Sequence, residues 1–151
     1  HVVITSVTRD DLEDGGASIW AKTILAVREK NPETTIEVLI PDFKGKWDSL
    51  KKVLDTRPDI LNHNIETVPR LYPHVRPQAV FERSVELLDL AKEAGFVTKT
   101  GMMLGIGERE DEIENTIQYL ARFCVDVLTL GQYLSPTKQH LSVDRWVKPE
   151  E

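Results

Sequence analysis

Apolar residues along the chain occur in two patterns, short runs and helical repeats. Runs rich in β-branched and aliphatic residues predict strands at residues 2–7, 35–41, 59–67, 96–104 and 125–133. Between the strands, apolar residues recur every three or four positions, which predicts helices at residues 17–30, 47–54, 80–91 and 111–123. The first run is β-branched almost throughout, and we expect it to form a buried strand.

Strands that alternate with helices at near-even spacing predict right-handed βαβ units around one parallel sheet. The chain has 151 residues, whereas a closed eight-unit barrel needs about 250. The predicted fold class is therefore α/β, either a partial (βα) barrel of the TIM type or a doubly wound open sheet. Polar loops follow four of the five strands, and they would lie at the end of the sheet where both architectures bind ligands.

Composition and charge exclude several kinds of partner. The net charge is −6 and the sequence pI about 5.3, with no basic stripe, so we expect no nucleic acid. No apolar run approaches the roughly 18 residues that cross a bilayer, and no signal peptide is visible, so we expect no membrane partner. The single cysteine, Cys124, excludes an internal disulfide and indicates a cytoplasmic protein.

The two ends of the sequence predict one domain over residues 1–151 that belongs to something longer. His1 leads directly into a strand, and the last residues resemble the opening of a helix, with Pro149 near its first turn. Cys124 falls between a helix and a strand, where we expect it to act as a small apolar residue.

The third predicted strand carries a row of polar side chains. Because side chains alternate along a strand, Asn62, Asn64 and Glu66 share one face, and residues 61, 63 and 65 share the other. A buried polar row is costly unless something hydrogen-bonds it, so this row predicts a wet, ligand-filled interior. The alternative is a polar face that packs on its own neighbours.

Other candidates each have a structural alternative. Lys99, inside the fourth strand, would anchor an anion or act as a Schiff-base nucleophile, or else reach the solvated rim. The arginines Arg70 and Arg76, with Tyr72, would grip an anion or remain solvated. His63 and Glu66 fall on opposite strand faces without a second histidine, so we expect a hydrogen-bonded structural histidine and no metal site.

Taken together, several blocks of the sequence resemble the lipoyl synthases. In chain order they are Thr5–Val7, Arg9–Leu12, Asp14–Ala17, Asn62–Tyr72, Val75–Pro77, Thr98–Glu108, Leu128–Leu134, His140–Leu141 and Pro149–Glu151. The resemblance implies a radical S-adenosylmethionine (SAM) enzyme on a partial (βα)6 barrel, with this chain's five parallel βα units at strands two to six. It also implies the insertion of two sulfur atoms into an octanoyl group on a lipoyl carrier domain. Two [4Fe–4S] clusters take part, one that cleaves SAM and one that donates sulfur.

The resemblance also implies roles for single residues. The expected SAM-binding residues lie in or just after the five strands: Thr5, Ser6, Gly15, Gly16, Asn62, Asn64, Glu66, Lys99, Gly101, Met103, Gly105, Glu108, Gln132, Tyr133 and Leu134. Among them, Gly15 and Gly16 match glycines near the methionyl amino group, and residues 101–108 match the family's G-x-I-x-G-x-x-E element near the adenine. Expected substrate contacts are Arg9, Arg70 and Arg76.

The chain departs from the family pattern in one major respect. The C-x3-C-x2-C motif and the auxiliary-cluster cysteines are absent, so we expect no catalytic residue and no metal ligand within these residues. We expect the chain alone to bind neither cluster and not to turn over. Ser135 also replaces an expected glutamine. Two alternatives remain at this stage, a (βα)-barrel lyase with Lys99 as its Schiff base and a non-catalytic SAM-binding scaffold.

Overall fold

The computed structural model describes residues 1–123 and 125–151, and the expectation for Cys124 lies outside them. Within this part of the chain, five parallel strands form one sheet in chain order. They are β1 (Val2–Thr5), β2 (Ile36–Leu39), β3 (Ile60–Asn62), β4 (Val97–Leu104) and β5 (Val127–Gln132). Each strand pairs in parallel with the next, through four, three, three and six residue pairs.

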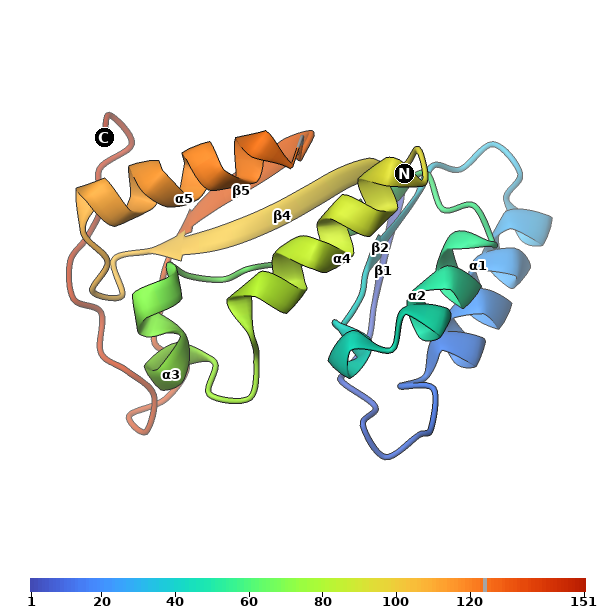
Figure 1. Ribbon diagram of the computed structural model, residues 1–151, viewed down its shortest axis with the longest axis horizontal. Helices are drawn as coiled ribbons and strands as arrows, with labels where there is room; N and C mark the ends of the chain where they lie inside the picture. The colour runs from blue at the N-terminus through green and yellow to red at the C-terminus, as the bar shows by residue number, and fades with distance from the viewer. Residues whose placement is uncertain (124) are drawn as a thin grey trace.

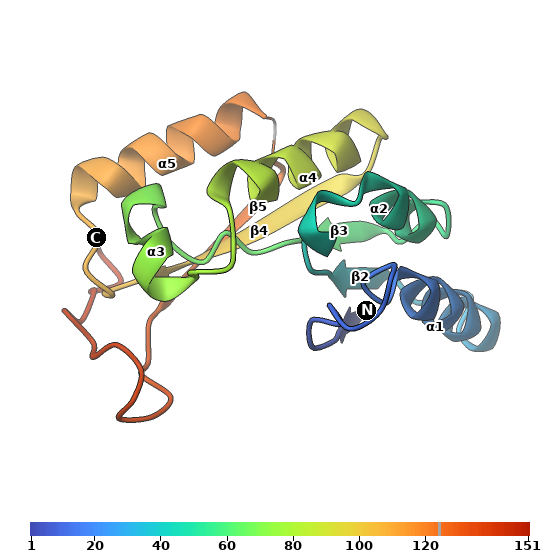
Figure 2. The same ribbon diagram turned by 60° about the horizontal axis from the view of Figure 1, so that its bottom comes forward.

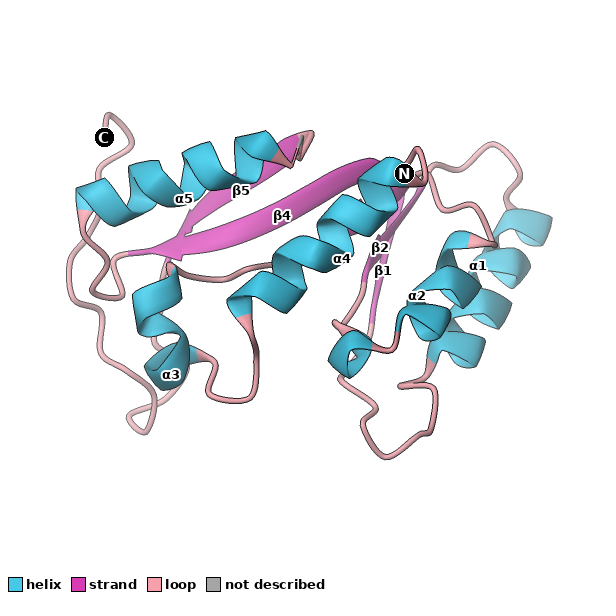
Figure 3. Ribbon diagram, viewed as in Figure 1, coloured by secondary structure: helices cyan, strands magenta, loops and turns pink. Residues whose placement is uncertain are grey.

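Helices connect the strands and cover one face of the sheet (Figures 1, 2 and 3). They are α1 (Ala17–Lys30), α2 (Trp47–Leu54), α3 (Tyr72–Val75), α4 (Phe81–Glu93) and α5 (Glu110–Arg122), with single turns η1 (Phe43–Gly45) and η2 (Pro69–Leu71). A doubly wound sheet reverses its strand order and carries helices on both faces. Sequential strands with one helix layer confirm the predicted partial barrel, and the sheet is not closed.

Two hydrophobic cores lie between the sheet and the helices. The first core packs α1 and α2 onto β2 and β3, with Trp20, Ile24, Val38 and Leu61 among its buried side chains. The second core lies under α3 and α5 at the other end of the sheet, around Tyr72, Met102 and Leu120. Helix α4 contributes to both cores: Leu87 and Leu88 to the first, Phe81 and Val85 to the second.

The expectation of a buried first strand at residues 2–7 is wrong. Strand β1 ends at Thr5 and forms one edge of the sheet, with alternate residues exposed. Val3 is 50% exposed and Val7, beyond the strand, 77%. The physical reason is that helices cover only one face, so every second side chain of β1 lacks a neighbouring layer.

The third strand is shorter than residues 59–67. Regular pairing stops at Asn62, and beyond it the backbone touches β4 again only through an isolated bridge between Glu66 and Met102. Glu66 adopts a left-handed φ of 65°. Asn62 and Asn64 still share one face, since Asn62 bonds the carboxylate that Lys99 also bonds and Asn64 packs on Gly101, two residues beyond Lys99. The period of two is broken at Glu66, because its backbone is left-handed.

Candidate functional site

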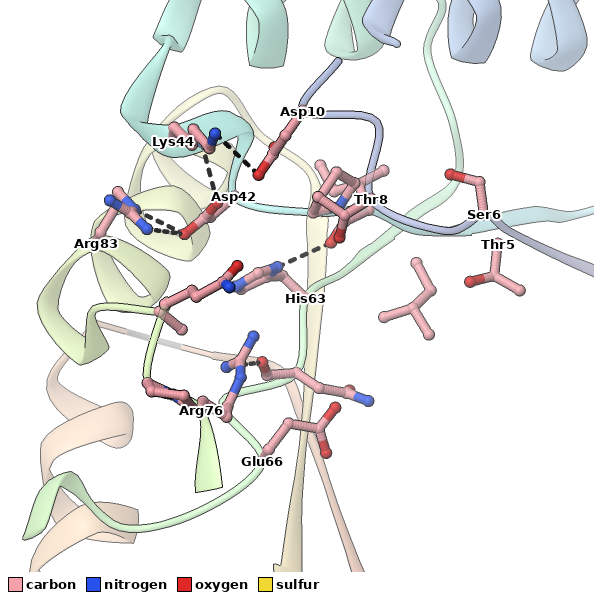
Figure 4. A pocket seen from close by; sticks show the side chains of 17 residues that line it. Thr5, Ser6, Thr8, Asp10, Asp42, Lys44, His63, Glu66, Arg76 and Arg83 are labelled. Carbon is pink, nitrogen blue, oxygen red and sulfur yellow. Dashed lines mark hydrogen bonds and ion pairs between the residues drawn. The ribbon is translucent and has the colours of Figure 1, made fainter. Parts of the chain in front are cut away.

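A cavity of about 550 Å³ opens at the carboxyl ends of β1, β2 and β3 (Figure 4). Five of the residues expected from the sequence line it: Thr5, Ser6, Asn64, Glu66 and Arg76. The volume falls within the roughly 300–1,000 Å³ of small-molecule sites. Its position agrees with the rule that parallel α/β folds bind ligands beyond the carboxyl ends of their strands.

Asn64 and Glu66 supply polar groups to this cavity from the irregular segment after β3. In Figure 4 the carboxylate of Glu66 points into the open part of the cavity, and it has no hydrogen-bond partner among the described residues. The amide of Asn64 packs on Gly101, where an added Cβ would lie 2.8 Å from Oδ1 of Asn64. Gly101 is therefore required to leave room for this amide.

Arg76 fixes the segment that carries these two side chains. Its Nη1 donates to the carbonyl oxygens of Asn64 (2.9 Å) and Ile65 (3.2 Å), and its guanidinium lies 5.5 Å from the ring centroid of Tyr72. The Tyr72 hydroxyl donates to the same Ile65 carbonyl (2.7 Å). Arg76 lines the cavity, but much of its hydrogen-bonding capacity is used to hold the backbone.

His63 is a structural histidine, as expected. Its Nδ1 is paired with the Ile40 carbonyl (2.8 Å) and its Nε2 with the hydroxyl of Ser84 on α4 (2.9 Å). Burial lowers the pKa of His63 to about 4. Removing an imidazolium from water costs more free energy than the hydrogen bond to the Ile40 carbonyl restores, so the neutral form is favoured. The neutral ring lines the cavity and links the segments that follow β2 and β3 to α4.

Two ion pairs in the cavity wall come from residues that the sequence did not single out. Arg83 of α4 pairs with Asp42 (2.6 Å), and Lys44 pairs with Asp10 (3.0 Å). Asp42 and Lys44 lie in the loop after β2, which reaches the same end of the sheet as the other loops. The polar residues that directly follow Pro41 were the signal that could have identified this loop.

A second polar cluster lies on the helix-free face of the sheet. Glu37 of β2 is only 2% exposed and accepts hydrogen bonds from Asn62 (Nδ2, 2.8 Å) and Lys99 (Nζ, 2.9 Å). Glu37 was missed because it interrupts an otherwise apolar strand. Asn62 is the last residue of β3 and pairs in register with Lys99, and Glu37 lies two residues before Leu39, which lines the cavity. The cluster therefore lies next to the cavity, one strand step below its floor.

Residues at the end of β4 hold a tight turn. Both carboxylate oxygens of Glu108 accept backbone hydrogen bonds, from Gly105 (2.6 Å) and Ile106 (2.9 Å), and its side chain is buried. Gly105 has φ +88°, and an added Cβ would lie 2.2 Å from the Arg145 carbonyl oxygen. Met103 is half-buried beside this turn.

The residues at the end of β5 hold the C-terminal segment. Gln132 donates to the Arg145 carbonyl (3.2 Å) and accepts from the Val147 amide (2.9 Å). The Tyr133 hydroxyl donates to the Leu141 carbonyl, and Leu134 is 63% exposed. These residues lie outside the cavity described above, so the structure does not bring the whole expected set into one pocket.

The glycine loop and the other two arginines complete the placement of the expected residues. Gly15 and Gly16 have left-handed φ values of 61° and 86° at the start of α1. Arg9 pairs with Asp11 in solvent, and Arg70 pairs with Glu112 (2.6 Å) and also donates to Gly107. The Arg70 guanidinium holds the pKa of Glu112 at about 2. Both arginines are thus engaged with carboxylates of the chain itself.

Within the described residues, no group of three or more histidine, cysteine, aspartate or glutamate side chains is arranged to hold a metal ion. Among the same residues no helix has the length and hydropathy of a membrane span. Nζ of Lys99 donates to both carboxylate oxygens of the buried Glu37 (2.9 and 3.3 Å), so this amine is engaged within the chain and does not line the cavity. The lyase alternative is therefore not favoured.

Comparison with known proteins gives a consistent result. The family model described as "Radical SAM superfamily" matches residues 1–120. Proteins named lipoyl synthase match the whole chain, with 57% identity in Rubrobacter xylanophilus, 58% in Desulfotalea psychrophila and 54% in Geobacillus thermodenitrificans. The chain covers 48%, 51% and 51% of these relatives, so it spans about half their length. The resemblance inferred from the sequence blocks is confirmed.

Solved structures share the fold at low sequence identity. Methylornithine synthase matches with a TM-score of 0.67 and 17% identity, over 78% of this chain and 34% of that protein. Coproporphyrinogen III oxidase from Escherichia coli, described as a radical SAM enzyme, matches with a TM-score of 0.66 and 17% identity, over 95% of this chain and 33% of its own. Both agree with the partial barrel.

Proposed function

The chain belongs to the radical SAM superfamily, and on that premise we propose that it forms the SAM- and substrate-binding part of a lipoyl synthase. The observation that carries the proposal is the identity of 54–58% to lipoyl synthases along the entire chain. The proposed reaction is the insertion of two sulfur atoms into a protein-bound octanoyl group, and the proposed partner is an octanoylated lipoyl carrier domain. The expected cytoplasmic location stays a prediction.

The cavity residues fit the polar groups of SAM. The carboxylate of Glu66, which has no hydrogen-bond partner in the part of the chain that the structure describes, and the amide of Asn64 suit ribose hydroxyls or the methionyl ammonium. Gly15 and Gly16 would receive the methionyl amino group, and Gly105 would lie near the adenine. When bound and reductively cleaved, SAM supplies the radical that abstracts hydrogen from the octanoyl chain. The residues named here would bind and orient SAM, and none of them moves a proton in this proposal.

The residues of this chain do not fit an iron–sulfur cluster. Such a cluster is held by about four cysteine thiolates, and the sequence contains one cysteine. Cluster ligands must therefore come from outside these 151 residues. The proposal accordingly treats residues 1–151 as one unit of a radical SAM core that holds SAM and substrate, and it derives no step at a cluster.

A segment exchange tests the proposed function. The matching segment of the Desulfotalea psychrophila lipoyl synthase, which is 58% identical to this chain, is replaced by residues 1–151. The exchanged enzyme is then assayed anaerobically by mass spectrometry for conversion of an octanoyl-lysine peptide into the lipoyl form. We expect product. If the exchanged enzyme folds and carries its clusters but forms no lipoyl peptide, the proposal is wrong.

Calorimetry on the chain itself tests the SAM pocket separately. We expect SAM to bind and Glu66→Ala to weaken binding by about tenfold, the loss of one charge-assisted hydrogen bond. Arg70→Met is the matched control, because Arg70 is bonded to Glu112 and lies outside the cavity. Absence of any SAM heat from the intact chain would contradict the proposed pocket.

A further inference from the structure

Three consecutive residues in the turn after β2 adopt left-handed backbone conformations. Their φ values are 48° for Phe43, 54° for Lys44 and 76° for Gly45. Glycine adopts this region freely, but an aromatic residue and a lysine do so at a cost in free energy. Such strain persists only where the surroundings determine the conformation. The contacts of this turn therefore indicate what it holds.

Asp42 fixes the start of the turn to helix α4. Its Oδ1 accepts from the backbone amide of Lys44 (3.0 Å), and its Oδ2 accepts from Nε of Arg83 (2.6 Å). The side chains of Asp42 and Arg83 are only 16% and 23% exposed, so this ion pair is shielded from water. The turn is thus anchored to the helix layer and not to the glycine loop alone.

The rest of the turn grips the glycine loop, residues 10–16, at three points. The Phe43 ring lies where a side chain at residue 15 would be, because a Cβ added to Gly15 would lie 2.9 Å from Cδ1 of Phe43. Nζ of Lys44 lies 3.0 Å from Oδ2 of Asp10, and Nζ of Lys46 donates to the Glu13 carbonyl (2.5 Å). Phe43 is 3% exposed. The three contacts reach the beginning, middle and end of the loop.

We infer that the turn Asp42–Lys46 is a positioning element that holds the glycine loop in the geometry needed to receive the amino-acid end of SAM. This inference rests on the proposed function, since it assumes that Gly15 and Gly16 face the methionyl amino group. Phe43 and Lys46 do not line the cavity, so they act through the loop. They are positioning residues and not catalytic ones.

The test compares two ligands that share the 5′-methylthioadenosine portion and differ in the amino-acid end and in the positive charge on sulfur. SAM carries adenosine and the methionyl group, whereas 5′-methylthioadenosine lacks the amino acid. Binding of each to the intact chain is measured by calorimetry for Phe43→Leu and Lys46→Met. The matched control is Lys51→Met, which removes an exposed lysine paired with Asp55 within α2.

We expect both variants to weaken SAM binding by about tenfold, the loss of one well-placed hydrogen bond, and to leave 5′-methylthioadenosine binding unchanged. An equal loss for both ligands, or no loss for either, overturns the inference. If the unaltered chain binds 5′-methylthioadenosine but not SAM, the inference also fails, because the loop is then not set to receive the amino acid. If the unaltered chain binds neither ligand, the proposed function itself fails.

Hydrogen exchange supplies a readout that needs no ligand. Amides of residues 10–16 should exchange faster in Lys46→Met than in Lys51→Met, while the amides of α4 exchange at equal rates in both. Unchanged exchange in the loop would overturn the inference even if SAM binding fell. This measurement separates failure of the positioning role from failure of the proposed function.

Discussion

The ammonium of Lys99 lies 2.9 Å from Oε1 of Glu37, and this ion pair joins β2 to β4 across the intervening strand. The Glu37 side chain is 3% exposed and that of Lys99 28%. Asn62 of β3 donates to the same Oε1 of Glu37, and His1 lies 3.3 Å from the other oxygen. The carboxylate is therefore stabilised almost entirely by its protein partners.

Removal of the lysine alone should destabilise the chain. Lys99→Met leaves the buried Glu37 carboxylate without its cation, and we expect the free energy of unfolding to fall by about 3 kcal/mol, the lower end for a broken buried pair. Glu37→Gln combined with Lys99→Met removes both charges and should recover most of this loss. Urea denaturation at pH 7 measures both variants. Equal losses in the single and double variants would contradict this account.

Acidification should destabilise the chain through His63. Its pKa is about 4 in the folded chain and about 6.5 when unfolded, so the unfolded state binds the proton first. The contribution of His63 should be lost as the pH drops from 6.5 to 4, a loss from this residue of about 3 kcal/mol at 1.36 kcal/mol per pKa unit. Urea titrations across this range measure it.

The matched variant for this prediction is His63→Gln, which does not titrate. It should be less stable than the parent at pH 7, because the hydrogen bonds to Ile40 and Ser84 are lost or lengthened. Its stability should depend less on pH between 6.5 and 4. Identical pH profiles for the two proteins would show that other groups control acid sensitivity.

A comparison of two glycines distinguishes the cost of a left-handed backbone from the cost of a steric clash. Gly95 and Gly105 have φ values of 86° and 88°, but an added Cβ meets nothing within 4 Å at Gly95 and lies 2.2 Å from the Arg145 carbonyl oxygen at Gly105. Gly95→Ala should cost about 1–2 kcal/mol from the left-handed conformation alone. Gly105→Ala should cost more and should speed hydrogen exchange at residues 144–147. Equal costs with unchanged exchange would contradict the contact.

Arg70 and Arg76 should respond differently to truncation. Arg76→Met removes the donor to two backbone carbonyls beside the cavity, and we expect a loss of about 2 kcal/mol in the free energy of unfolding. Arg70→Met breaks an exposed ion pair with Glu112 and should cost about 1 kcal/mol or less. Thermal unfolding compares them directly. A larger loss of stability in Arg70→Met than in Arg76→Met would mean that the ion pair with Glu112 contributes more than is expected of an exposed pair.

The strand and helix order could be predicted from the sequence because each element has its own apolar period. The apolar periods alone did not decide between a partial barrel and a doubly wound sheet, since both share the same order of elements along the chain. The resemblance to the lipoyl synthases indicated the partial barrel, which the strand order confirms. That choice depends on which strands pair and which face the helices cover. The break after Asn62 was also not predictable, because nothing in the local pattern requires Glu66 to adopt a left-handed φ.

The candidate site was predicted in part. Resemblance to a family identified Asn64 and Glu66, which line the cavity, but it could not show that Arg9 and Arg70 are already paired within the chain. Whether an arginine is already paired within the chain depends on residues distant in the sequence, and Glu112 lies 42 residues from Arg70. The turn at Phe43 was missed because strained backbone in a non-glycine residue has no compositional signal.

Helix α4 has a consequence for how the molecule folds. One end of this helix belongs to the second core and the other to the first, while β3 is joined to each neighbouring strand by only three residue pairs. Without this shared helix, few contacts would couple the unfolding of one half of the sheet to that of the other. We therefore expect α4 to make unfolding cooperative across the whole chain. A destabilising substitution at the midpoint of α4 should replace the single unfolding transition by two.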